Sequence, residues 1–457
     1  MTKRTIALSF LLAILFGQDA LAQYPFGKNK INYAKRKWKV LQTDNVDIYY
    51  YPSERDLATF AAPIVEETYA EFGELFDMKF RNRMPLVFFS SHYDFQQTNI
   101  IRSFISEGTG GFTDLIKGRI AIPFTGSLWH FRHVIRHEMV HAFMLEKMAQ
   151  VMQEHNRFAY TQPPLWFIEG MAEYFAMQGE ESTEFNMFIR DGLMHNRLPD
   201  LLNIWQIYGS YLMYKEGEAV CHYIADNFGE EAIIQILEDW WVGESFDMVL
   251  QHTIDRSLGQ LSDGFMKSLK RRYYPSILNA SFAPDIGKQL TQPRSYHARP
   301  AVTRGSDGET KLYSNYAHDG VITIAELKRD KRGRIEHRIL VESARSARFE
   351  WIPASRSKLE ARSDTLMFVA KRHERDAIYL IDTRKAKEFE FYTFPELSII
   401  SSPTLSPRGD RIVFSAIDSN GRTDLFVCTR ATGELVRLTD DPYGEQDPDF
   451  HPTENRV

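Results

Sequence analysis

The chain has 457 residues, of which 43% are hydrophobic, and this is enough apolar content to build two or three domains and to exclude a disordered protein. The formal net charge of -6 is mild and no long basic run occurs, so the charge pattern indicates no nucleic-acid partner. The two cysteines, Cys221 and Cys428, fall in segments that we assign to different domains, so no disulfide framework is expected and Cys221 is predicted to be a buried free thiol.

Residues 1–22 have the pattern of a secretory signal peptide. Lys3 and Arg4 form a basic start, an apolar run follows from Ile6 to Phe16, and Ala20-Leu21-Ala22 provides a small-residue cleavage site. Gln rather than Cys follows at position 23, so lipid attachment is not expected. The pattern predicts an exported protein, periplasmic or secreted, with no membrane span after cleavage; an uncleaved anchor is the alternative.

Residues 23–128 are predicted to form an N-terminal α/β part. Hydrophobic periodicity predicts a strand, an amphipathic helix and a second strand at Val46–Tyr51, Glu54–Phe76 and Met84–Phe89. A hairpin is expected from Phe112–Ile116 and Arg119–Pro123. Its edge could pair with an extended peptide, and a hairpin that only completes a sheet is the equal alternative.

Residues 129–285 are predicted to be helical. The first two helices are expected at Trp129–Gln153 and from Pro163-Pro164 to about Gln178. Further helices are predicted at Tyr208–Asn227, Glu230–Trp241, Phe246–Thr253 and Leu261–Tyr273.

The first of these helices carries His137-Glu138-Met139-Val140-His141. Two histidines four residues apart project from one helix face about 6 Å apart, which suits two corners of a tetrahedral zinc site. Glu138, next to the first histidine, is placed to act as the general base on a water. In a chain of this size and composition about 0.06 such motifs are expected by chance.

A zinc site of this kind needs a third protein ligand. Glu169, 28 residues after His141, is the candidate because it lies on the second helix among Trp166, Phe167 and Tyr174. These neighbours predict a largely buried helix, where an unpaired carboxylate would be costly.

This combination resembles the gluzincin-type (peptidase MA-like) zinc metallopeptidases, the clan that includes thermolysin and the aminopeptidase N group. In that clan a second helix supplies a glutamate within an Asn-Glu-Gly-Phe-Ala pattern, and here Ile168 replaces the Asn. The resemblance implies zinc ligands at His137, His141 and Glu169, a general base at Glu138, and an acid at Glu173 that orients a ligand histidine through its other ring nitrogen.

The segment Tyr214-Lys215-Glu216-Gly217 resembles the Tyr-Glu-Lys-Gly segment that carries the oxyanion tyrosine of the aminopeptidase N group, with Lys and Glu exchanged. The resemblance implies a catalytic role for Tyr214, with Tyr211 as the nearest rival. His133 shares a helix face with His137 and is expected to be a surface or cleft histidine, a substitute ligand being the alternative.

The aminopeptidase N group also has a Gly-x-Met-Glu-Asn segment that captures a free amino terminus. The corresponding stretch here reads Glu107-Gly108-Thr109-Gly110-Gly111-Phe112 and lacks that segment. Internal cleavage of a polypeptide is therefore the expectation.

After about residue 290 the chain changes character: a linker is predicted at 286–297 and a β-rich domain at 298–457. Pro403, Pro407 and Arg411 recur 45 residues later as Pro448, Pro452 and Arg456. A period of 45 residues with about four strands per unit is typical of β-propeller blades.

The segments Ser406–Phe414 and Leu438–Pro442 resemble the TolB-like propeller family. The resemblance implies a propeller that binds a protein partner or gates access. About three blades fit, and because the chain stops at Val457 inside what should be the next blade's strand, we expect a fragment.

The predicted fold is therefore an α+β gluzincin-like catalytic domain, a small sheet plus a mainly helical half, followed by an all-β propeller that is incomplete in this chain. The predicted function is an exported zinc metallopeptidase, acting on a peptide or protein substrate as an endopeptidase. The alternative is a propeller-based interaction module with a catalytically silent or structural zinc site. An intact Glu138 argues against that alternative, because a structural site needs no base.

Overall fold

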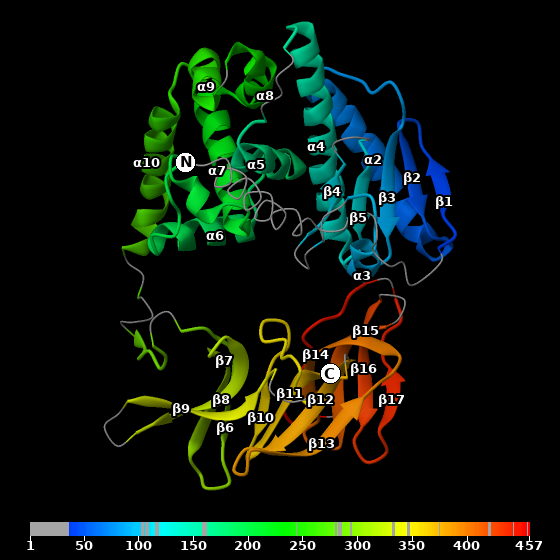
Figure 1. Cartoon of the computed structure of the whole chain (residues 1–457), viewed down its shortest axis with the longest axis vertical. Helices are drawn as coiled ribbons and strands as arrows, with labels where there is room; N and C mark the ends of the chain where they lie inside the picture. Colours follow the sequence, from blue (N-terminus) through cyan, green and yellow to red (C-terminus); the bar gives the residue numbers. More distant parts are fainter. Residues whose placement is uncertain are drawn as a thin grey trace, which may run out of the picture. The chain divides into compact units, whose positions relative to one another are not determined.

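The computed structural model describes residues 36–101, 105, 109–114, 118–157, 162–243, 245–278, 281, 286–292, 295–330, 334–344, 348–373, 375–418, 422–441, 443–454 and 456–457 (Figure 1). The predicted signal peptide lies outside these residues. The chain divides into two compact units, one of Met1–Phe124 with Arg132–Asp263 and the other of Thr125–Phe131 with Gly264–Val457. Each unit is described by itself.

The first unit contains a five-stranded sheet in the order β1-β2-β3-β5-β4. Its strands are β1 (Lys39–Gln42), β2 (Val46–Tyr50), β3 (Met84–Phe89), β4 (Phe112–Thr113) and β5 (Ile120–Pro123). The strands β2, β3 and β5 run parallel, whereas β1 and β4 pair antiparallel at the two edges. The antiparallel pairing of β4 with β5 confirms part of the predicted hairpin; residues 115–117 of its first strand and turn lie outside the described residues. Among the described residues, one edge of β4 is unpaired in this sheet.

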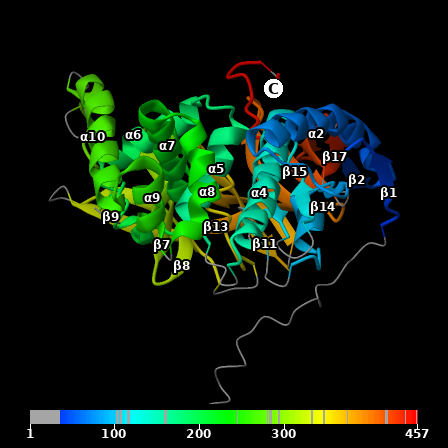
Figure 2. The ribbon, with the colours of Figure 1, turned by 90° about the horizontal axis from the view of Figure 1, so that it is seen from above.

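Helices make up the rest of this unit. They are α2 (Arg55–Leu75), α3 (His92–Gln96), α4 (Leu128–Glu154), α5 (Leu165–Ala176), α6 (Thr183–Met194), α7 (Tyr211–Phe228), α8 (Glu231–Glu238) and α9 (Phe246–Ile254). The last helix, α10 (Leu258–Ile277), begins in this unit and ends in the second. Single turns of 3₁₀ helix are η1 (Pro52–Glu54), η2 (Ile204–Ile207) and η3 (Asp239–Val242). Both views of the ribbon place α4 between the sheet and the helices α5 to α9 (Figures 1 and 2).

The predicted helices of this region are present, each within a few residues of its expected ends. Sequence periodicity missed β1, α3 and α6. Two of these elements have only 4 and 5 residues, too few to show a period. The third, α6, buries only a narrow stripe of four residues, Phe185, Ile189, Gly192 and Leu193.

The second unit contains three four-stranded sheets among its described residues, each formed by four consecutive antiparallel strands. Their strands are β6 (His297–Arg304), β7 (Thr310–His318), β8 (Val321–Arg329) and β9 (Ile335–Glu342); β10 (Glu360–Arg362), β11 (Thr365–Arg372), β12 (Arg375–Asp382) and β13 (Lys387–Thr393); and β14 (Leu397–Leu405), β15 (Arg411–Asp418), β16 (Thr423–Thr429) and β17 (Glu434–Arg437). Consecutive four-stranded meanders are the architecture expected of propeller blades. The sequence carries a matching repeat, because Leu366–Ala370 of β11 resembles Ile412–Ala416 of β15, and Ile378–Ile381 of β12 resembles Leu425–Cys428 of β16. The residues Pro448 to Arg456 of the predicted proline repeat follow β17, and none of those that the structure describes is in a strand.

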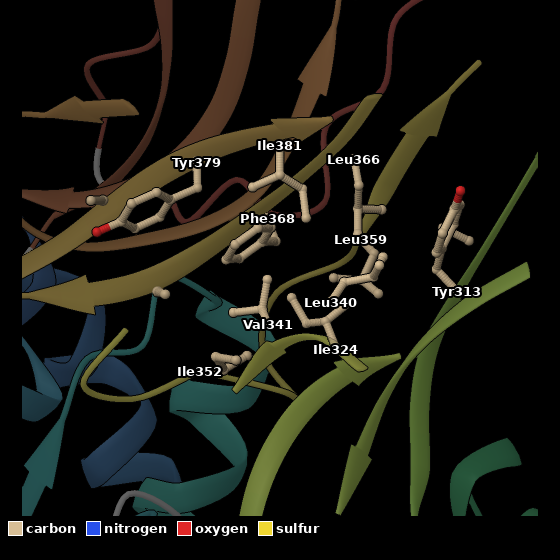
Figure 3. Packing of buried hydrophobic residues seen from close by; sticks show 13 residues of the cluster. Tyr313, Ile324, Leu340, Val341, Ile352, Leu359, Leu366, Phe368, Tyr379 and Ile381 are labelled. Atoms are coloured by element: carbon tan, nitrogen blue, oxygen red, sulfur yellow. The ribbon is translucent and has the colours of Figure 1, made fainter. Parts of the chain in front are cut away.

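The middle sheet of this unit is buried on both faces. On β11 and β12, Leu366, Phe368 and Tyr379 belong to one buried cluster with residues of β8 and β9 in the first sheet (Figure 3). Their neighbours Met367 and Ile378 point the other way and pack against the third sheet. Since side chains alternate between the faces of a strand, two apolar faces produce the continuous hydrophobic runs seen in the sequence.

Both cysteines are free and buried, as predicted for Cys221. Within the described parts of the chain, no helix is long and apolar enough to cross a membrane.

Candidate metal centre

Three side chains from two helices converge in the first unit. His137 Nε2 and His141 Nε2, on α4, lie 3.1 Å apart. Glu169 Oε2, on α5, lies 3.3 Å from His137 Nε2 and 3.2 Å from His141 Nε2. A tetrahedron with metal–ligand bonds of about 2.0–2.1 Å has edges of about 3.3 Å, so these three atoms have the spacing of three zinc ligands. The three residues predicted as ligands can hold a metal ion.

The charges of the histidines and glutamates in this group shift one another's pKa values. Burial would raise the pKa of Glu169, but His141 and His137 outweigh burial and hold that pKa well below its ordinary value. Burial would likewise lower the pKa of His137, but Glu169 and Glu173 raise it well above its ordinary value. A carboxylate and two imidazoles that stabilise positive charge between them form a donor set suited to a divalent cation.

Glu173 lies one turn after Glu169 on α5, and its carboxylate meets the other side of His137. His137 Nδ1 lies 3.1 Å from Glu173 Oε1. This buried nitrogen has no hydrogen-bond partner of good geometry among the described residues, so Glu173 is the acceptor within its reach. The arrangement matches the orienting role expected of Glu173, in which a carboxylate selects the ring nitrogen that faces the metal.

His133 lies against the same carboxylate, with Nε2 at 3.4 Å from Glu173 Oε1. It is partly buried rather than a surface histidine, because α5 covers this face of α4. His133, His137 and Glu173 form a second group whose ligand atoms are close enough to hold a metal ion. The structure does not bring His133 to His141 and Glu169, so it is not placed as a substitute ligand for the first group.

Glu138 is buried beside the ligand group and faces β4. Thr113 Oγ1 donates a hydrogen bond of 2.8 Å to Glu138 Oε2. A Cβ added at Gly111 would lie only 2.9 Å from Glu138 Oε1, so the backbone before β4 runs directly against this carboxylate. Burial raises the pKa of Glu138, although His141 and His137 oppose the shift. A carboxyl group with a raised pKa next to a metal site is suited to accept and return a proton.

Tyr214 on α7 completes the wall of the site. Its ring lies nearly parallel to the His137 ring, with centroids 6.4 Å apart and planes inclined by 13°. Burial, together with the charge and hydrogen bond of Glu169, raises the pKa of Tyr214. Its rival Tyr211 is 45% exposed and lies against Lys215, whose Nζ is 5.3 Å from the Tyr211 ring centroid. Of the two tyrosines, the structure brings Tyr214 to the predicted ligands.

Two glycines bring α7 close to α5. A Cβ on Gly170 would lie 2.1 Å from the Gly217 carbonyl carbon, and a Cβ on Gly217 would lie 2.0 Å from the Trp166 carbonyl oxygen. The two helices therefore cross with their backbones in contact, which a side chain at either position would prevent. This crossing explains why Tyr214, one turn before Gly217, reaches Glu169.

Arg136 is a functional neighbour that sequence reasoning missed. Its guanidinium, only 2% exposed, forms two hydrogen bonds to Glu71 of α2, at 2.9 and 2.6 Å. It also donates to the carbonyl oxygens of Phe175 and Ala176 at the end of α5. One side chain thus joins three helices beside His137 and Glu138. The available signal was an arginine inside the apolar wall of a helix, where an unpaired charge would be costly.

No protein-family model and no curated protein matches this chain. Among solved structures, it is similar to TolB from Acinetobacter baumannii, with 18% identity, a TM-score of 0.25, and coverage of 33% of this chain and 34% of the other. Oligogalacturonate lyase from Vibrio parahaemolyticus matches with 15% identity, a TM-score of 0.29, and coverage of 36% and 46%. A puromycin hydrolase S511A mutant matches with 16% identity, a TM-score of 0.24, and coverage of 34% and 23%.

The chain thus spans less than half the length of these three structures. At these identities and TM-scores, the functions of those proteins say nothing about the chemistry of this chain. The interpretation of the candidate site therefore depends on its own residues.

Proposed function

We propose that this protein is an exported zinc-dependent metallopeptidase of the gluzincin type that cleaves polypeptides internally. The observation that carries the proposal is the convergence of His137, His141 and Glu169 at 3.1–3.3 Å, with the buried carboxylate of Glu138 beside them. Export rests on the signal-peptide pattern of residues 1–22.

The donor set fits zinc better than calcium or magnesium, because two imidazole nitrogens and one carboxylate are borderline ligands in a small tetrahedral arrangement. A zinc ion bound there would supply a Lewis acid that polarises water and the carbonyl of the scissile bond. Three protein ligands leave the fourth position for these reactants, which distinguishes a catalytic site from a structural one.

The residues of the chain then have separate tasks. Glu138, hydrogen-bonded by Thr113, accepts a proton from the attacking water and returns it to the leaving amine. In this proposal Tyr214, which lies beside Glu169, donates its hydroxyl hydrogen to the oxyanion that develops on the substrate. Glu173 keeps the His137 ring in the orientation that presents Nε2 to the ligand group.

The edge strand β4 offers a way to hold the substrate. It ends the sheet order, and Thr113 within it contacts Glu138. An extended polypeptide that added to this edge would form main-chain hydrogen bonds and lie beside the general base. Main-chain recognition does not require a free amino terminus, and this supports internal cleavage.

For the second unit we propose a role in binding a protein partner or in restricting the access of substrates to the candidate metal centre. The support is the series of three four-stranded sheets with the predicted 45-residue repeat. This part of the proposal is independent of the metal centre.

The experiment compares zinc content and cleavage of casein for the wild type, Glu138→Gln and Glu146→Gln, the last being an exposed glutamate on the same helix. We expect all three proteins to retain zinc, and Glu138→Gln alone to lose cleavage by about 10²-fold or more. Zinc in all three with cleavage in none would refute the peptidase and favour the interaction module. Unchanged metal content in Glu169→Ala would separately refute the third ligand.

A further inference from the structure

Lys215 is a buried cation next to the candidate metal centre, although it contacts none of the three predicted ligands. It is 4% exposed, on α7. Its Nζ lies 2.6 Å from Glu173 Oε2 and 2.9 Å from Glu218 Oε2. A lysine is rarely buried to this extent unless it is paired, so these two acids account for its position.

Of the two acids, Glu173 is the closer partner, and its distance from Lys215 Nζ is 2.6 Å against 2.9 Å for Glu218. Glu218 lies on α7 itself, three residues after Lys215, whereas Glu173 lies on α5. Lys215 and Glu173 therefore form the ion pair that joins the two helices.

The two oxygens of Glu173 have different partners. Lys215 takes Oε2, whereas Oε1 faces His137 Nδ1 at 3.1 Å and His133 Nε2 at 3.4 Å. A carboxylate held by one oxygen cannot rotate freely to withdraw the other. The position of Lys215 thus determines which atom of Glu173 meets His137.

The close crossing of α5 and α7 makes this contact feasible. Gly217 lies two residues after Lys215, and its contact with Gly170 brings the start of α7 against α5. Had Lys and Glu stood in the order found in the aminopeptidase N segment, position 215 would hold a glutamate facing Glu173. Two carboxylates would then repel each other in a buried environment.

We propose that Lys215 is a positioning residue for the metal centre: by holding Glu173 Oε2 it sets Oε1 against His137, which then presents Nε2 to the metal. This inference rests on the proposed metal site and identifies what fixes its orientation. The positive charge also neutralises Glu173, so the group of His133, His137 and Glu173 is not expected to take a second metal ion.

The chain offers a matched control. Lys147 on α4 pairs with Glu238 Oε1 of α8 at 2.7 Å, and its side chain is 12% exposed. This pair also joins two helices of the same unit through a largely buried lysine, but it touches none of the metal-centre residues. Removing it tests the effect of losing such an ion pair in general.

The test measures zinc affinity by competition with a chelator for full-length wild type, Lys215→Met, Glu173→Gln, the double variant Lys215→Met/Glu173→Gln, and Lys147→Met. We expect Lys215→Met and Glu173→Gln each to raise the zinc Kd by about 10–100-fold, the range known for residues that orient metal ligands. The double variant should bind no more weakly than the weaker single variant, because both changes remove one interaction. Lys147→Met should stay within about twofold of the wild type.

The visible spectrum of the Co²⁺-loaded protein provides a second measurement that a purely structural role would not change. It should shift in Lys215→Met and remain as in the wild type in Lys147→Met. If Lys215→Met fails to fold, the double variant is compared with Glu173→Gln, because neither charge of the pair is left alone in the double variant. Equal zinc affinity in these two proteins supports the proposal, and a further loss of affinity in the double variant overturns it.

A zinc Kd within twofold of the wild type in Lys215→Met would overturn the positioning role. A zinc Kd of the double variant that is raised by the product of the two single effects would overturn it as well. A loss of zinc affinity in Lys147→Met equal to that in Lys215→Met would also overturn the positioning role. A wild type that binds zinc but cleaves nothing refutes the peptidase alone, whereas a wild type that binds no zinc refutes the metal site.

Discussion

Glu216, next to Lys215 on α7, is expected to destabilise the folded protein at neutral pH. It is fully buried, and neither of its carboxylate oxygens has a hydrogen-bond partner among the described residues. Burial, with a smaller effect from Asp200, raises its pKa from an ordinary value of 4.5 to about 9. The folded state therefore holds a neutral carboxylic acid that the unfolded state ionises.

The sign and size of the effect follow from proton linkage. Because the folded pKa exceeds the unfolded pKa, the folded state binds more protons, and stability falls as the pH rises from about 4.5 to about 9. The loss is at most ~1.4 kcal/mol per pH unit, so at pH 7 it amounts to about 3 kcal/mol. Glu216→Gln removes the ionisable group and keeps the shape, so it should recover most of this free energy.

Thermal melting of the wild type, Glu216→Gln and the exposed control Glu146→Gln at several pH values tests this prediction. At pH 7 the Glu216→Gln protein should melt ~6–12 °C higher than the wild type, and near pH 4.5 the difference should vanish. The control should match the wild type throughout. A Glu216→Gln protein that is less stable than the wild type at pH 7 would show that Glu216 is ionised and paired, and the reasoning would be wrong.

Three further predictions concern the supports of the site. Gly217→Ala should destabilise the unit by about 1–3 kcal/mol or more and weaken zinc binding, since a Cβ would lie 2.0 Å from a backbone oxygen of α5; a melting temperature equal to the wild type would contradict this. Arg136→Met should lower the free energy of unfolding by about 3 kcal/mol in a denaturant titration, because Glu71 and two carbonyl groups lose the hydrogen bonds from Arg136. A decrease below about 1 kcal/mol would refute the role of Arg136 in joining α2, α4 and α5. Thr113→Val should leave the zinc Kd unchanged and lower kcat/KM about tenfold by removing the hydrogen bond to Glu138; a loss of metal instead would show that Thr113 supports the ligands.

The local elements were predictable because their signals are local. The α4 helix and the β3 strand appear where hydrophobic periodicity places them, and similar segments 46 or 47 residues apart lie on β11 and β12 and again on β15 and β16. The pair His137 and His141 needed only a helix to come together, since a spacing of four residues defines one face. The third member, Glu169, was chosen from its buried surroundings and from resemblance.

Interactions between side chains of different helices could not be predicted from the sequence in this way. Neither the spacing of Arg136 from Glu71 nor that of Lys215 from Glu173 carries a signal, because each pair forms only when separate helices pack. The exchange of Lys and Glu at positions 215 and 216 was visible as a departure from a pattern. Its consequence depended on the contact between α5 and α7.

The sequence by itself determined the helix with two histidines and a base, the candidate third ligand, and the repeat of four-stranded units. The first of these depends on residues near one another in the chain, where the helix period dictates which side chains share a face. The third ligand also needed the family resemblance, and the repeated units needed the recurrence of similar segments. The tertiary structure alone decided that Glu169 lies 3.2 Å from His141 and that Lys215 holds Glu173. It also decided that Glu216 is buried with no hydrogen-bond partner in the part of the chain that the structure describes. Each of these facts depends on how separate helices pack, and the distance between two helix axes is set by packing rather than by any local preference of the chain.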